Sequence, residues 1–154
     1  MENFTGGGWS TSLPHEFPRH CVVYSGTHDN DTSRGWFERS GTLEERAFAL
    51  RYVGSDGRHF AWDLCRLAHA SVAETAILPL QDVLDLGTEA RMNLPARPDG
   101  NWAWRFRSGA LGSEVTARLG EWTSVYGRWP RARAPVVPTL LTAEATPVHS
   151  TGRG

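Results

Sequence analysis

Six consecutive small polar or ionisable residues, Thr27–Thr32, are the part of the sequence best equipped for chemistry. They follow a short apolar run at 20–25, and reacting groups in parallel α/β folds lie where strands end. His28 and Asp29 are thus placed for catalysis, since a carboxylate stabilises developing positive charge and an imidazole hydrogen-bonds a substrate hydroxyl. The same residues also suit a turn whose side chains bond their own backbone, and spacing does not decide between the two.

Metal-binding patterns are incomplete in this chain. A calcium loop beginning at Asp29 lacks the glycine and the final glutamate that such a loop needs. Cys65 and His69 lie one helical turn apart and could share a zinc ion with Cys21 and His28, but no CxxC pair accompanies them. We expect no metal site and no cofactor.

A second group of polar and aromatic residues occupies Pro79–Gly87, Ala90–Pro95 and Gly100–Arg105. These segments combine amide, guanidinium and indole groups, which suit a neutral polyhydroxyl ligand because planar polar groups pair with hydroxyls and flat apolar faces cover a sugar ring. Seven tryptophans in a chain this short favour a sugar-stacking cleft. An ordinary aromatic core is the alternative.

Two short strands and two helices between them should position these groups. The apolar runs 20–25 and 75–78 predict parallel strands buried on both faces, joined by a helical crossover. Thr42 and Glu45 have capping-box spacing and predict a helix start. The helices should bury two apolar faces, the first made of Leu43, Ala47 and Leu50, the second of Phe60, Leu64, Leu67 and Ala68.

The flanking segments carry weaker patterns. Residues 1–20 are rich in glycine and proline and predict an N-terminal loop, and residues 92–107 predict another loop. A last amphipathic helix should follow within 115–126. Residues 130–154 hold four of the nine prolines and no period, so we expect a disordered tail. The folded part should therefore span 21–129.

Composition removes several classes of function. The 154 residues carry 16 basic and 17 acidic groups, a net charge of -1, which disfavours a nucleic-acid partner. Every basic residue is arginine, so Schiff-base and P-loop lysines are absent. No apolar run is long enough to cross a membrane and no secretory signal precedes the two cysteines. We expect a cytoplasmic protein with reduced thiols.

Several segments, in this order, resemble the C-terminal end of 4-alpha-glucanotransferases of the amylomaltase type, glycoside hydrolase family 77. The resemblance covers most of residues 13–126. It rests on Leu13-Pro14-His15, Val22-Val23-Tyr24-Ser25-Gly26-Thr27-His28-Asp29-Asn30-Asp31-Thr32, Gly35-Trp36, Ala76-Ile77-Leu78-Pro79-Leu80-Gln81-Asp82, Ala90-Arg91-Met92-Asn93 and Gly100-Asn101-Trp102-Ala103-Trp104-Arg105.

The resemblance implies the C-terminal portion of a (β/α)8 TIM barrel, with residues 21–25 and 75–78 as strands seven and eight. It also implies a retaining mechanism on α-1,4-glucans, in which a nucleophile and an acid/base residue act with a third carboxylate. Asp29 matches that third carboxylate, the transition-state stabiliser. His28 matches a neighbour that hydrogen-bonds the sugar, and Asn93 should lie close by as a further substrate-binding residue.

The resemblance also implies that the nucleophile and the acid/base residue lie on earlier strands that this sequence does not contain. We therefore expect a fragment that is inactive alone and that needs the N-terminal part of the barrel as a partner. The alternative is a non-catalytic carbohydrate-binding or interaction protein derived from a truncated glucanotransferase. It would use the same tryptophan and asparagine groups without turnover.

Overall fold

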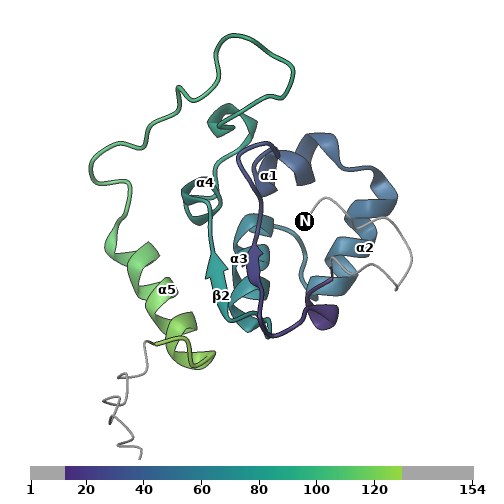
Figure 1. The fold of residues 1–154 in the computed structure, drawn as a ribbon, viewed down its shortest axis with the longest axis vertical. Coiled ribbons are helices and arrows are strands. Elements are labelled where there is room, and N and C mark those ends of the chain that lie inside the picture. The colour runs from purple at the N-terminus through teal and green to yellow at the C-terminus, as the bar shows by residue number, and fades with distance from the viewer. Residues whose placement is uncertain (1–12, 130–154) are drawn as a thin grey trace, which may run out of the picture.

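Two parallel strands and the helices around them make up the α/β fold of this protein. A computed structural model describes residues 13–129, in which β1 (Val22–Tyr24) pairs with β2 (Thr75–Ile77) and Val23 lies opposite Ala76. The predicted order of strand, helices and strand is confirmed (Figure 1). The predicted disordered tail at 130–154 and the first twelve residues of the predicted N-terminal loop lie outside the described residues.

The crossover between the strands begins earlier than the sequence predicts. Thr32 caps α1 (Ser33–Gly35), its hydroxyl accepting a hydrogen bond from the Gly35 N–H at 3.0 Å, and a π-helical turn, η2 (Trp36–Ser40), follows. The turn follows tertiary packing, because Trp36 and Phe37 stack on Phe60 with ring centroids 5.6 and 4.4 Å away.

The predicted capping box at the start of α2 (Leu43–Val53) is confirmed. The Glu45 N–H donates to the Thr42 hydroxyl at 3.2 Å, and the Thr42 N–H donates to the Glu45 carboxylate at 2.8 Å. The predicted apolar face of this helix is right only at Leu50, which is half-buried and packs against the core. Leu43 and Ala47 are exposed, while Ala49 and Val53 are buried. The reason is that α2 joins the core through its C-terminal half, where Ala49 and Val53 pack with the next helix.

Helix α3 (Phe60–Ala70) is the centre of the core, as its apolar spacing predicts. Phe60 and Leu64 pack with α2, and Ala68 packs with Val23 of β1 and with Ala73. A third side of the helix, formed by Trp62 and Cys65, packs against the segments that follow β2. One helix therefore holds the sheet, the crossover and the C-terminal segments together.

The sheet is buried on one face only, which corrects the prediction of strands buried on both faces. Val23 faces α3 and is buried, whereas Val22, Tyr24 and Ile77 are 46%, 42% and 46% exposed. Side chains alternate across a strand, and within residues 13–129 a helix covers only the side of Val23. The other face of the sheet is an open apolar surface.

The chain after β2 joins the core twice, first through a short helix that contains Val83 and again through its last helix. Helix α4 (Leu80–Val83) and a 3-10 turn, η3 (Thr88–Ala90), precede a long loop and α5 (Ser113–Val125), which lies at the edge of the molecule (Figure 1). Apolar residues of α5 pack against Trp62 and Cys65. Arg128, just after α5, donates to the Ala68, His69 and Ser71 carbonyls at 3.3, 2.6 and 2.9 Å.

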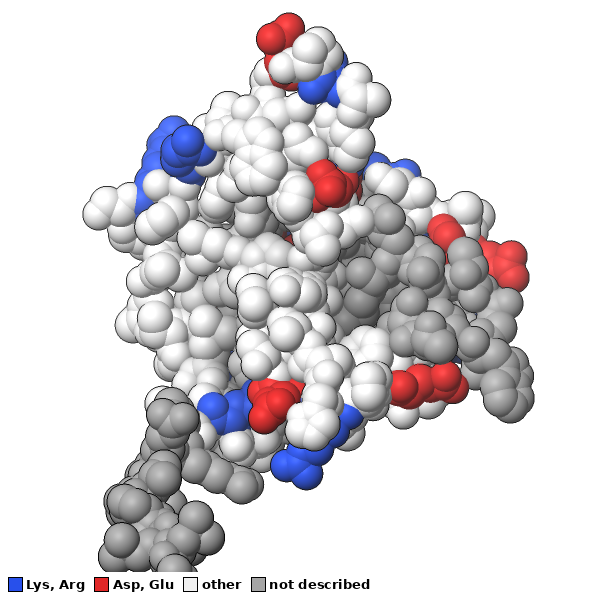
Figure 2. All heavy atoms as spheres, in the orientation of Figure 1, with Lys and Arg blue, Asp and Glu red and all other residues white. Residues whose placement is uncertain are grey.

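Charge and cysteine chemistry give little sign of a second site. On the face drawn in Figure 2, arginines and carboxylates form small groups around a broad uncharged area. Cys21 and Cys65 are free thiols, as expected, and burial raises the pKa of Cys65 because a thiolate would be desolvated. Among residues 13–129, none of the helices is long and apolar enough to cross a membrane.

Candidate functional site

Two neighbouring polar residues in the loop after β1, Asp29 and Asn30, make different kinds of contact. Asn30 accepts hydrogen bonds from the N–H and the hydroxyl of Thr27 at 2.8 and 2.7 Å, so it forms the local turn. The neighbouring Asp29 carboxylate makes different contacts, with the side chains of Asn93 and the adjacent His28. The turn interpretation therefore applies to Asn30, and the Asp29 carboxylate is left for other contacts.

Asp29 is held by its neighbour His28 and by two residues of a distant segment, Arg91 and Asn93. The Asn93 amide donates to Asp29 Oδ1 at 2.6 Å, and His28 Nε2 lies 3.3 Å from Asp29 Oδ2. The Arg91 guanidinium donates to the Asp29 backbone carbonyl at 2.6 Å and to the Asn93 carbonyl at 2.8 Å. The structure thus brings together all three residues that the sequence singled out, His28, Asp29 and Asn93.

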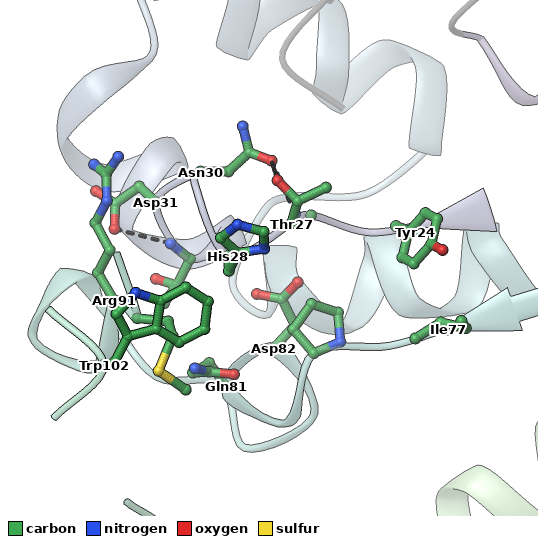
Figure 3. Close-up of a pocket in the computed structure, with 14 residues that line it drawn as sticks. Tyr24, Thr27, His28, Asn30, Asp31, Ile77, Gln81, Asp82, Arg91 and Trp102 are labelled. Carbon is green, nitrogen blue, oxygen red and sulfur yellow. Dashed lines mark hydrogen bonds between the residues drawn. The ribbon is translucent and has the colours of Figure 1, made fainter. Parts of the chain in front are cut away.

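A pocket of about 530 Å³ opens beside this group at the C-terminal ends of both strands. His28 and Arg91 line it, and Tyr24 and Ile77 extend it toward the open face of the sheet (Figure 3). Asp29 and Asn93 lie next to the pocket rather than in its wall. The side chains of His28 and Asp29 are each 53% exposed, so both can reach a ligand.

A buried carboxylate beneath the loop fixes its two ends, and the sequence analysis gave Asp82 no such role. The side chain of Asp82 is almost fully buried and accepts hydrogen bonds from the Ser25 hydroxyl at 2.6 Å and from the Ser33 hydroxyl and N–H at 2.8 Å. Burial raises the pKa of Asp82, and these donors oppose the rise. Ser25 directly follows β1 and Ser33 begins α1, so this contact sets the span of the loop that carries His28.

Arg91 and Asp31 were also missed as supporting residues. Asp31 accepts from the Thr88 hydroxyl at 2.9 Å, which joins the loop to η3, and Arg91 follows η3 directly. The available signal was position: Asp82, Thr88 and Arg91 all follow the second apolar run, as the first loop follows the first run. Polar residues after both strands of a parallel pair meet at one edge.

The arrangement suits binding of hydroxyls and stabilisation of a cation by Asp29. The two carboxylates in the pocket wall, Asp31 and Asp82, are engaged by hydroxyl donors of the fold. Among residues 13–129, groups of three or more His, Cys, Asp or Glu side chains that could hold a metal are absent. His69 Nδ1 instead bonds the Cys65 carbonyl at 3.0 Å.

Comparison with known proteins decides the family. The sequence model of the family described as 4-alpha-glucanotransferase matches residues 2–111. The chain belongs to this family. The 4-alpha-glucanotransferase of Thermus thermophilus is 50% identical over 124 residues, which are 75% of this chain and 25% of that protein. The 4-alpha-glucanotransferase of Clostridium butyricum is 41% identical over 128 residues, 81% of this chain and 26% of that protein.

A solved structure agrees with this glucanotransferase family assignment. The amylomaltase from Streptococcus agalactiae, determined in complex with acarbose, superimposes with a TM-score of 0.74 at 36% identity. The match covers 81% of this chain and 25% of the amylomaltase. This glucanotransferase-family chain therefore spans about a quarter of the length of its relatives.

Proposed function

We propose that this chain forms the C-terminal part of a (β/α)8 barrel that transfers α-1,4-glucan segments between maltodextrins. Residues 1–20 lead into the barrel, β1 and β2 are its seventh and eighth strands, and residues 21–129 belong to it. Family membership supports this proposal. The observation that carries it is the Asp29 carboxylate, which Asn93 and His28 hold at the end of a parallel strand.

The proposed reaction is a retaining double displacement. A carboxylate nucleophile and an acid/base residue about 5 Å apart form and resolve a covalent glycosyl intermediate. Asp29 stabilises the oxocarbenium-like transition state because its negative charge lies at a fixed position, and His28 and Asn93 donate to sugar hydroxyls. Since Asp31 and Asp82 are committed to the fold, we assign the nucleophile and the acid/base residue to the N-terminal part of the barrel.

This assignment makes that N-terminal part the polypeptide partner of the chain. Supplying it adds further strands at the two edges of the sheet, and the inward side chains of those strands cover the open apolar face, as a closed barrel requires. We also propose that the assembled protein works in the cytoplasm, where its two free cysteines stay reduced.

Splicing tests the proposal. This chain should replace the matching quarter of the Thermus thermophilus relative, with which it shares 50% identity, and the product is incubated with maltotriose. We expect glucose and longer maltodextrins from the spliced protein and neither product from this chain alone, because transfer needs a nucleophile and a proton donor. Turnover by the chain alone would refute the assignment of those residues to the N-terminal part. A folded but inactive spliced protein that still binds maltodextrin would favour the non-catalytic carbohydrate-binding alternative.

A further inference from the structure

Trp102, one of the tryptophans that the sequence links to a sugar-binding cleft, places a large flat side chain at the pocket, and the proposed reaction gives it no part. Its indole lines the pocket beside Met92, and its ring centroid lies 5.0 Å from that of His28 at an angle of 39° (Figure 3). The residue is nevertheless 53% exposed. An aromatic ring that lines a pocket and stays half open has an apolar face available to a ligand.

The backbone of Trp102 is held in a conformation that bulky residues rarely adopt. Its φ is +60°, in the left-handed region, where a large side chain is a true outlier. Its N–H donates to the Met92 carbonyl at 2.7 Å, and Arg105 donates to its carbonyl at 2.7 Å. The side chain of Asn101 accepts from the Leu94 N–H at 2.8 Å and donates to the Leu94 carbonyl at 3.3 Å.

These hydrogen bonds of the loop fix the backbone from which the half-exposed ring projects. A strained position that the surroundings hold on both sides is typical of functional sites. His28 lies next to the ring, and it contacts Asp29, which in turn accepts a hydrogen bond from Asn93. A pyranose has a face of C–H groups and a rim of hydroxyls, so it can meet an apolar plane and these polar groups at the same time.

We propose that Trp102 is the platform on which one pyranose ring of the glucan stacks while His28 binds its hydroxyls. This inference rests on the proposed function and deepens it, because it makes the ring form of the ligand a requirement of the site. Open-chain polyols carry the same hydroxyls but lack the flat C–H face. Trp102 is then a specificity-determining residue that separates cyclic sugars from other polyhydroxyl compounds.

Native electrophoresis of this chain through gels containing soluble amylose tests the platform, with free maltotriose or glucitol as competitor. We expect amylose to retard the chain, maltotriose to release it and glucitol to have no effect. Trp102→Leu should weaken amylose binding about tenfold or more, and Trp102→Phe should keep most of it because a flat ring remains. Trp129→Leu is the matched control, since Trp129 is 59% exposed and lies outside this pocket.

The outcomes separate the platform from the wider proposal. If the wild-type chain binds amylose and Trp102→Leu binds it equally well, the platform is refuted and the glucan site stands. Release by glucitol as effective as release by maltotriose also refutes the platform. If the wild-type chain does not bind amylose, the glucan site itself is refuted, and the platform with it.

Discussion

Asp29 and Asn30 are neighbours with similar side chains, yet their contacts divide the work of the loop. Asn30 bonds Thr27 and builds the turn, while Asp29 is held by Asn93 from a segment 64 residues away. The sequence located His28, Asp29 and Asn93 through position and family resemblance, but it left the turn and the catalytic interpretations of the loop open. The long-range contact to Asn93 shows that the Asp29 carboxylate is engaged outside the local turn, and such contacts leave no local pattern in a sequence.

Replacing Asp29 by asparagine in the spliced enzyme should separate charge from shape. Asp29→Asn keeps the size of the side chain and removes the negative charge opposite the developing oxocarbenium, so kcat should fall by about 10² to 10³ or more with little change in KM. Asn93→Ala removes one hydrogen bond to Asp29 and should have a smaller effect, raising the free energy of activation by about 1 to 3 kcal/mol. Steady-state kinetics on maltotriose measures both, and a near-normal kcat for Asp29→Asn would end the catalytic assignment.

Asp82 should give the fold a pH dependence that an amide lacks. Because burial raises its pKa above the ordinary 3.8, the folded protein holds this proton more tightly than the unfolded chain does. Its contribution to stability is therefore full below about pH 3.8 and is lost as pH rises through the raised pKa.

The free energy of unfolding of wild type minus that of Asp82→Asn should accordingly decrease as the pH is raised from about 4 toward neutrality. Urea unfolding at a series of pH values measures it. The control is Asp99→Asn, which removes an exposed loop carboxylate that bonds neither Ser25 nor Ser33. A difference that grows with pH would contradict the buried-carboxylate account.

At the scale of elements, the sequence predicts the features of a helix that depend on its own residues. The capping box starts α2 as expected, and the apolar spacing of α3 predicts its extent and one of its buried sides. It does not predict the side formed by Trp62 and Cys65. The π-helical turn at Trp36–Ser40 and the buried face of α2 were not predictable, because both depend on contacts with α3. The buried sheet was mispredicted for a related reason: an apolar run shows what a strand could pack against, not whether that partner is present.

Gly35 should be intolerant of a methyl group because α1 approaches η3 at this position. An added Cβ would lie 2.5 Å from Thr88 Oγ1 and 2.6 Å from Asp31 Oδ1, so it would disturb the bond between those two side chains. We expect Gly35→Ala to lower the unfolding free energy by about 1 to 3 kcal/mol. Gly120→Ala in α5 meets open space and should raise it by up to about 1 kcal/mol. Chemical denaturation compares the two, and equal effects would exclude a steric origin.

At the scale of the whole molecule, the open sheet decides behaviour in solution. Val22, Tyr24 and Ile77 form an apolar face beside unpaired strand edges, and within residues 13–129 nothing covers it. Exposed apolar patches and strand edges favour association. The same face is where we propose that the N-terminal part of the barrel packs, so the isolated chain should replace the missing contact with copies of itself.

Sedimentation velocity should reveal this self-association as a concentration-dependent increase in mean mass. The double variant Val22→Thr and Ile77→Thr keeps strand-forming residues and makes the face more polar, so it should shift the protein toward monomer. Leu43→Gln is the control, because Leu43 is also an exposed apolar residue but lies on α2. If Leu43→Gln reduces association as much as the double variant, the sheet face is not the contact.

Arg128 ties the C-terminal end of the described chain to the end of α3. By bonding the carbonyls at the end of α3, it fastens the chain after α5 to the central helix, and the ring of Trp122 meets Trp62 at 5.2 Å alongside it. The long loop between η3 and α5 therefore does not bear the connection alone. A protease that cut this loop would leave two pieces that stay associated. Members of this family could also lengthen or shorten the loop while α5 keeps its contacts with α3.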